Sequence, residues 1–330
     1  MQVNFSLPVK KMVILGTGGT IAGRAANPGD NVGYVAGQVG IEELLESVPG
    51  LAVASDIVCE QVAQIDSKDM SFTVWASLAM RVSHFLARDD VQGVVVTHGT
   101  DTLEETAFFL QTLLNPAKPV VLTCAMRPAT ALFPDGPQNV LDAVSVARHV
   151  GARGVVAVCA GFIHGAIDVQ KTSTIRLDAF SSAEAGPIGY VEEGLPKMLR
   201  NWPETSHPWA EADVKTLAEM ASDGAWPKVE IVMNFAGASG VAVQALQASG
   251  VEGLVVAGTG NGTLHTDLEA ALLAAHAAGV RVMRSTRCAM GHVTVTRDDP
   301  FEDAKGLSPV KARVALILHL LRAKIGKQAS

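Results

Sequence analysis

The sequence predicts an α/β protein of two domains, a larger amino-terminal domain with a doubly wound parallel sheet and a smaller α/β domain after it. Short runs rich in valine and isoleucine alternate with segments of helical periodicity, which is the order of a parallel sheet with crossover helices. The chain has 330 residues and is 48% hydrophobic, enough for two cores. Only 5% of residues are aromatic and 31 are glycine, a balance that suits strands buried on both faces.

The amino-terminal domain is predicted over 1–191. Strands are expected at 12–15, 52–58, 91–96, 119–122 and 154–158, and helices at 41–48, 72–86, 102–114 and 140–150. The helix at 72–86 has the clearest pattern, because Trp75, Leu78 and Val82 recur at helical spacing. This strand–helix alternation favours a parallel sheet in which ligands bind at the carboxyl ends of the strands.

A break in the alternation predicts an interdomain linker over 192–228. This stretch has many charges and three neighbouring tryptophan–proline pairs. The alternation then resumes, and a smaller domain is predicted over 229–330. Its strands are expected at 229–233, 253–257 and 280–283, and its helices at 241–248, 268–278 and 310–323.

Charge and cysteine usage exclude several classes of protein. The formal charge is −7, with basic and acidic residues interspersed, so no nucleic-acid footprint is expected. No apolar run is long enough for a membrane span, and residues 1–11 lack the apolar core of a signal peptide. The four cysteines form no CxxC pair and have apolar surroundings, which indicates buried, reduced thiols. We therefore expect a cytoplasmic protein without a membrane or nucleic-acid partner.

A glycine-rich turn follows the first predicted strand, in the segment VILGTGGTIAG (13–23). A turn of this kind is weak evidence for dinucleotide binding, and its glycine spacing is not GxGxxG. The acidic residue expected about 20 positions after the turn would have to be Asp30 or Glu42, and neither ends a predicted strand. The turn would also present the Thr17 hydroxyl at a strand end, where doubly wound sheets bind ligands. Both a structural turn and a reactive threonine remain open from the residues alone.

A second polar turn ends the strand predicted at 91–96, in the segment VVVTHGTDTLEET (94–106). Asp101 and Thr102 each match the start of a capping box, and for Thr102 capping is the preferred interpretation. A cap needs one polar group, whereas Thr97, Thr100 and Asp101 crowd the same strand end. His98 is interpreted as a buried histidine with satisfied hydrogen bonds.

Two further segments carry polar residues that are not assigned by pattern alone. In 66–70, DSKDM, Ser67 or Asp69 is expected to cap the following helix. In 168–174, DVQKTST, Lys171 would be taken for a solvated surface lysine if it stood by itself.

Together these segments resemble the bacterial L-asparaginase family over nearly the whole chain. TGGTIAG (17–23) and THGTDTLEET (97–106) look like the two signature segments of that family. Family-like stretches also occur at 33–37, 125–128, 135–137, 186–190, 258–262 and 309–313. The resemblance implies a threonine-nucleophile amidohydrolase that converts L-asparagine to L-aspartate and ammonia, and it implies no metal or organic cofactor.

The resemblance also implies the roles of the catalytic residues. Thr17 is assigned as the nucleophile that forms an acyl-enzyme, and Tyr34, on a lid loop among glycines, is assigned to its activation. Lys171, held against Asp101, would act on the Thr100 hydroxyl, with a water between these groups as the hydrolytic nucleophile.

The substrate would bind through its α-substituents. Asp101 would pair with the α-ammonium group, and Ser67 with the backbone N–H groups around Gly99 would bind the α-carboxylate. Lys68 stands where many relatives have Gln or Glu near the ammonium group, so it must point away or pair with Asp66 or Asp69. By analogy we expect a homotetramer built from two dimers.

Two positions depart from the family pattern. Gly237 stands where relatives often have an Asn that reaches the site of a neighbouring subunit. Many relatives also use a Glu from the neighbour's carboxyl-terminal domain, and the candidate for that residue here is Glu302.

Three alternatives stay open. The first is the same chemistry on L-glutamine, since one methylene changes specificity only about 10- to 200-fold. The second is a nucleotide-dependent enzyme using the glycine-rich turn, and the third is an inactive amino-acid-binding protein. An inactive amino-acid-binding protein would still hold its ligand after Thr17→Ala and would never release ammonia.

Overall fold

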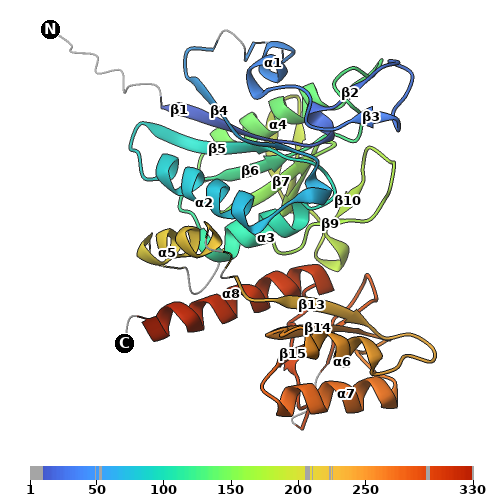
Figure 1. Cartoon of the computed structure of the whole chain (residues 1–330). Helices are drawn as coiled ribbons and strands as arrows, with labels where there is room; N and C mark the ends of the chain where they lie inside the picture. Colours follow the sequence, from blue (N-terminus) through green and yellow to red (C-terminus); the bar gives the residue numbers. More distant parts are fainter. Residues whose placement is uncertain are drawn as a thin grey trace, which may run out of the picture. The chain divides into compact units, whose positions relative to one another are not determined.

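The computed structural model describes residues 10–48, 50–51, 54–204, 209, 211–222, 224, 226–294 and 298–328. The chain divides into two compact units, Met1–Ala210 and Glu211–Ser330. Each unit is a parallel-dominated sheet with helices on its faces, which confirms the predicted two-domain α/β fold (Figure 1). Among the described residues, no helix has the length and apolar character needed to cross a membrane.

The first unit contains an eight-stranded sheet in the order β12-β11-β8-β7-β6-β5-β1-β4. Five strands run parallel, namely β1 (Lys11–Gly18), β4 (Ile57–Ile65), β5 (Val91–Thr97), β6 (Val120–Thr123) and β7 (Val155–Cys159). Three antiparallel strands extend the sheet beyond β7, namely β8 (Phe162–Gly165), β11 (Gly189–Glu192) and β12 (Leu195–Met198). The sheet is therefore mixed, with its parallel part in the order of a doubly wound fold.

Helices cover both faces of this sheet (Figure 1). Helices α1 (Ile41–Glu46) and α4 (Gly136–Arg148) share one core with the side chains of Met12 and Ile14. Helices α2 (Phe72–Leu86) and α3 (Leu103–Leu114) pack on the sheet through β5 and β7. All residues of β7 are buried, which explains why its sequence is a continuous apolar run.

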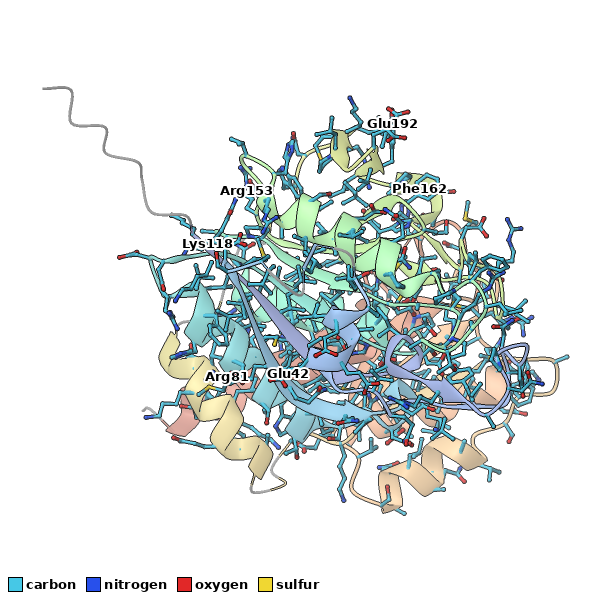
Figure 2. All side chains as sticks on the ribbon, turned by 90° about the horizontal axis from the view of Figure 1, so that it is seen from above. Glu42, Arg81, Lys118, Arg153, Phe162 and Glu192 are labelled. Carbon is cyan, nitrogen blue, oxygen red and sulfur yellow. The ribbon has the colours of Figure 1, made fainter. Side chains whose placement is uncertain are left out.

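The edge strand β4 differs from its prediction. It was expected at 52–58, partly outside the described residues, and lies at Ile57–Ile65. Because β4 is at the edge, polar side chains are tolerated along it, and the apolar-run criterion misses it. Its Glu60 carboxylate accepts two hydrogen bonds of 2.6 Å from Arg81 on α2. At the other side of the sheet, Phe162 on β8 is exposed (Figure 2).

Several small elements of the first unit lie outside this sheet. They are the hairpin β2 (Arg24–Ala25) and β3 (Tyr34–Val35), the hairpin β9 (Gln170–Lys171) and β10 (Phe180–Ser181), and the 3₁₀ turns η1 (Thr20–Ala22), η2 (Ser67–Asp69) and η3 (Ala183–Ala185). Helix α2 is capped by the Ser71 hydroxyl, which accepts from Val74 N at 3.3 Å, and not by Ser67 or Asp69 as predicted. Helix α4 begins four residues before its predicted start, with a proline in its first turn.

The second unit is a four-stranded parallel sheet in the order β13-β14-β15-β16. The strands are β13 (Val229–Met233), β14 (Gly253–Gly258), β15 (Arg281–Thr286) and β16 (Glu302–Asp303), and the helices are α5 (Glu211–Ser222), α6 (Val241–Ala248), α7 (Thr266–Ala277) and α8 (Pro309–Gln328). The linker predicted over 192–228 differs from the structure, because this stretch contains β12 and α5. Both elements have only short apolar segments between charged residues, so their patterns do not stand out in the sequence.

Candidate active site

The candidate site lies where the order of the parallel strands reverses. Strand β1 is followed by β4 on one side, whereas β5, on its other side, is followed by β6. The chain therefore leaves β1 and β5 in opposite directions, and doubly wound folds bind their ligands at the carboxyl ends of such a strand pair. The two signature segments end these same two strands, so the sheet itself brings them together.

Glycines allow the two turns to touch through their backbones. Gly19 has a φ of +82°, and a Cβ atom there would lie 2.2 Å from the Cα atom of Gly99. A Cβ atom on Gly99 would lie 2.4 Å from the Ser67 hydroxyl oxygen. Neither position can carry a side chain, so both glycines are explained by close approach. Thr20 and Thr100 each follow directly after one of these glycines.

The two threonines of the first turn have different environments. Thr17 is 2% exposed, and its hydroxyl donates to the Thr97 carbonyl oxygen at 2.9 Å. This hydrogen bond joins β1 to β5 and occupies the hydroxyl proton. The Thr20 hydroxyl lies instead 2.6 Å from the Tyr34 phenol oxygen. The geometry thus favours Thr20 over Thr17, the sequence-based choice, as the activated hydroxyl.

Tyr34 is held by the β2–β3 hairpin. Residues Arg24 and Ala25 pair with Val35 and Tyr34 in an antiparallel register. A Cβ atom on Gly23 would lie 2.8 Å from the Tyr34 ring, so the ring packs against bare backbone. The hairpin is tied down at its base, where Ala25 N donates to the Thr130 hydroxyl at 2.9 Å. These contacts bring the phenol to Thr20.

A lysine, a threonine and an aspartate form the second group of the site. The Lys171 ammonium group donates to the Thr100 hydroxyl oxygen at 2.9 Å and to Asp101 Oδ1 at 2.5 Å. Thr100 is 5% exposed, and the Lys171 side chain is 20% exposed. The Asp101 side chain is 51% exposed, so its carboxylate is accessible. Three of the predicted residues, from segments 70 positions apart, are therefore in direct contact.

Ser67 connects the turn after β4 to the same group. Its hydroxyl accepts from Asp101 N at 3.1 Å, and its carbonyl accepts from the Thr102 hydroxyl at 2.8 Å. Thr102 occupies the position before α3, as predicted, but its side chain makes no capping hydrogen bond. It fastens the Ser67 turn instead.

Lys68 does not stand as a lone cation. Its ammonium group lies 2.6 Å from Asp66 Oδ2 and 3.4 Å from Asp69 Oδ2. The hydrogen bond to Asp66 raises the pKa of Lys68. Asp66 directly follows β4, the second parallel strand in the chain. The Asp66 carboxylate binds the Lys68 ammonium group and also accepts a hydrogen bond of 3.3 Å from the Lys68 backbone N–H group.

His98 is part of a buried chain of hydrogen bonds behind the site. Its Nδ1 lies 2.7 Å from the Gly99 carbonyl oxygen, so Nδ1 carries the proton. Its Nε2 then accepts from the Thr106 hydroxyl at 3.0 Å, and that hydroxyl accepts from the Trp75 indole at 2.8 Å. Both ring nitrogens are satisfied, which confirms the interpretation of His98 as a buried structural histidine. Burial lowers the pKa of His98 to about 4.

This pKa predicts a loss of stability in mild acid. His98 stays neutral in the folded protein but takes a proton below pH 6.5 when unfolded, so stability falls as pH drops from 6.5 towards 4. The loss attributable to His98 is about 2 kcal/mol at pH 5. Urea unfolding of wild type and His98→Asn at pH 7 and pH 5 measures it. An equal pH dependence in both proteins would contradict the assignment.

The cysteines have no role in the described contacts of the site. Cys124 and Cys159 are buried with their sulfurs 3.1 Å apart, and all four cysteines are free thiols. Burial raises the pKa of Cys124, which keeps it protonated and unreactive. These environments agree with the packing role predicted for Cys124. The prediction that all four thiols are buried is wrong for Cys288, which is exposed, and for Cys59, which is half-buried.

The two positions expected to reach a neighbouring site lie in the second unit. Gly237 has a φ of +77° in the turn after β13, which favours glycine there. Glu302, in β16, pairs with Arg281 of β15. The carboxylate proposed for a neighbour therefore has a partner within its own sheet.

Comparison with known proteins gives the same family for both parts of the chain. The family described as "Asparaginase, N-terminal" matches residues 11–204, and "Glutaminase/Asparaginase C-terminal domain" matches residues 228–329. The chain is 38% identical to "L-asparaginase 2" of Escherichia coli, over 98% of this chain and 92% of that protein. It is also 38% identical to "Probable L-asparaginase periplasmic" of Haemophilus influenzae, over 95% and 89%.

A solved structure agrees with both. The probable cytoplasmic L-asparaginase from Campylobacter jejuni superposes with a TM-score of 0.86 at 37% identity, covering 94% of this chain and 95% of that one.

Proposed function

Because the chain belongs to the asparaginase family, we propose that it hydrolyses the side-chain amide of L-asparagine to L-aspartate and ammonia. The observation that carries this proposal is the pairing of Thr20 with Tyr34 at the switch point, beside the Lys171–Thr100–Asp101 group. An amidohydrolase needs one activated hydroxyl and one group that activates water, and the two clusters meet that need.

Thr20 is the proposed nucleophile. Its oxygen attacks the amide carbon while its proton passes to the Tyr34 oxygen, 2.6 Å away, and the phenol passes its own proton on to the leaving nitrogen. The carbon–nitrogen bond then breaks, and ammonia departs from an ester between Thr20 and the aspartyl group. Thr17 supports this step indirectly, because its hydrogen bond to Thr97 fixes the turn that precedes Thr20.

Thr100, Lys171 and Asp101 are proposed to serve the water step. The Lys171 ammonium group polarises the Thr100 hydroxyl, which orients a water for attack on the ester carbon. Attack breaks the ester, returns the proton to Thr20 and releases L-aspartate. The accessible Asp101 carboxylate pairs with the substrate ammonium group, and Ser67 with the Gly99 backbone binds the α-carboxylate.

The test is ammonia release from L-asparagine and L-glutamine by the purified protein. A higher kcat/KM for asparagine supports the proposal. Release from neither substrate by folded protein would overturn it and favour an amino-acid-binding protein. Glutamine is the second candidate, since the matched carboxyl-terminal family is described with both activities and one methylene discriminates only about 10- to 200-fold.

Lys68 is expected to be neutralised by its aspartates, so that it does not repel the substrate ammonium group. Replacing Asp66 with asparagine removes the closer partner and leaves Lys68 only its more distant contact with Asp69, so that its positive charge is less fully compensated. We expect KM for L-asparagine to rise about two- to fivefold with kcat unchanged, as suits an exposed ion pair. Steady-state kinetics at low salt measure the change. The double variant Asp66→Asn/Lys68→Gln should restore KM, and a double variant with KM still raised would contradict the explanation.

We also propose a cytoplasmic homotetramer built from two dimers. Reduced cysteines and the cytoplasmic neighbour support this compartment, although the relative from Haemophilus influenzae is named periplasmic. Cell fractionation tests the compartment, and sedimentation of the purified protein tests the assembly. A monomer would exclude the tetramer.

A further inference from the structure

Lys171 lies outside the main sheet, so its position depends on other contacts. Its strand β9 pairs with β10 alone, in a two-stranded hairpin separate from the eight-stranded sheet (Figure 1). The Thr172 N–H group donates to Ala179 O at 2.8 Å, on the β10 side of the hairpin. Because successive N–H groups of a strand point to opposite sides, the Lys171 N–H group points away from β10.

The carboxylate of Glu104 accepts that outward N–H group. Glu104 Oε2 lies 2.7 Å from Lys171 N, across 67 positions of sequence. Glu104 is in the first turn of α3, where the helix dipole stabilises a carboxylate. A buried or half-buried backbone N–H group without an acceptor is costly, so this bond fixes β9 against the start of α3.

Main-chain and side-chain contacts of Lys171 therefore converge on one short segment. The ammonium group binds Thr100 and Asp101, and the backbone N–H group binds Glu104, which lies one helical turn after them. Residues 100–104 therefore hold both the ammonium group and the backbone of Lys171. If the backbone bond is lost, β9 can shift while the flexible side chain still reaches outward, and the ammonium group no longer has a fixed position at Thr100.

We propose that Glu104 is a positioning residue for the proposed reaction, which holds Lys171 against Thr100 through the Lys171 N–H group. This inference rests on the proposed amidohydrolase function. The bond needs an oxygen acceptor at this place and not a negative charge. Glutamine can replace glutamate at this position because its amide oxygen accepts the same hydrogen bond, whereas alanine and methionine cannot.

The experiment compares kcat and KM for L-asparagine in wild type, Glu104→Ala, Glu104→Met and Glu104→Gln, together with the thermal unfolding midpoint of each. We expect the alanine and methionine variants to lose about 10- to 100-fold in kcat, the scale that a 1 Å misplacement produces, with KM changed less than about threefold. The glutamine variant should keep at least half of wild-type kcat. The methionine variant retains the aliphatic stem and decides the question if the alanine variant fails to fold.

Glu105→Gln is the matched control, because it removes an equal charge from the same turn about 100° further round α3. It should keep wild-type kcat. Wild-type kcat in Glu104→Met, or equal losses in Glu104→Gln and Glu104→Met, would overturn the inference. A loss of kcat in proportion to the folded fraction would also overturn it. Absence of ammonia release by wild type would instead refute the proposed function.

Discussion

Replacing Thr20 with alanine is expected to lower kcat for L-asparagine by about 10³-fold or more, as removal of a covalent nucleophile does in other hydrolases. The physical reason is the 2.6 Å contact with Tyr34, whose phenol oxygen accepts the Thr20 proton during the attack. Without the hydroxyl no ester forms, so rapid mixing should show no initial release of ammonia. The variant should unfold at nearly the wild-type temperature, because the change is small.

Thr17→Val is the matched control for Thr20→Ala. Thr17 is buried, and its hydroxyl is committed to the Thr97 carbonyl oxygen. We expect a loss of about 1 kcal/mol in the free energy of unfolding, with kcat kept within about tenfold of wild type. The opposite pattern, an inactive Thr17→Val beside an active Thr20→Ala, would restore the assignment made from the sequence.

The sequence could not decide between these two threonines for a definite reason. Thr17 and Thr20 flank the same pair of glycines, and both follow the same strand. What distinguishes them is the position of the Tyr34 phenol oxygen, which contacts Thr20. The β2–β3 hairpin sets that position, and Tyr34 is 14 positions from Thr20 in the sequence. Local pattern contains no information about that contact. In the same way, the 2.7 Å bond of Glu104 to Lys171 N crosses 67 positions and leaves no local signal.

The fold was predictable where burial is uniform. The bounds predicted for α2, β13 and α6 agree with the structure, because each has a clear period or a short apolar run. Strands β8, β11 and β12 were not predicted. They run antiparallel at the edge, with exposed residues such as Phe162 and Leu195, so neither strict alternation nor a buried run marks them.

The contacts among Lys171, Thr100 and Asp101 were predictable only through the resemblance. As a lone residue in a polar stretch, Lys171 would have been taken for a surface lysine. The structure instead gives it two side-chain partners at 2.9 and 2.5 Å. For Lys68, the resemblance together with its charge predicted either a side chain that points away or one that pairs with Asp66 or Asp69. The structure supplies Asp66 and Asp69.

Replacing Lys171 with methionine is expected to lower kcat by about 10³-fold while leaving the first chemical step faster than the second. Methionine keeps the length of the side chain and loses the ammonium group that contacts Thr100 and Asp101. Thr20 and Tyr34 remain, so the ester should still form and rapid mixing should show about one ammonia released per site before slow turnover.

This burst separates Lys171→Met from Thr20→Ala, which should show none. Lys171→Arg tests whether charge alone suffices. A guanidinium group keeps the cation but is planar and holds its protons, so it cannot reproduce the compact contact with the Thr100 hydroxyl, and kcat should stay below about a tenth of wild type. If Lys171→Met gave neither a burst nor turnover, Lys171 would act on the attack by Thr20 as well. The two clusters would then form one proton-transfer unit, because their glycines already bring them into backbone contact.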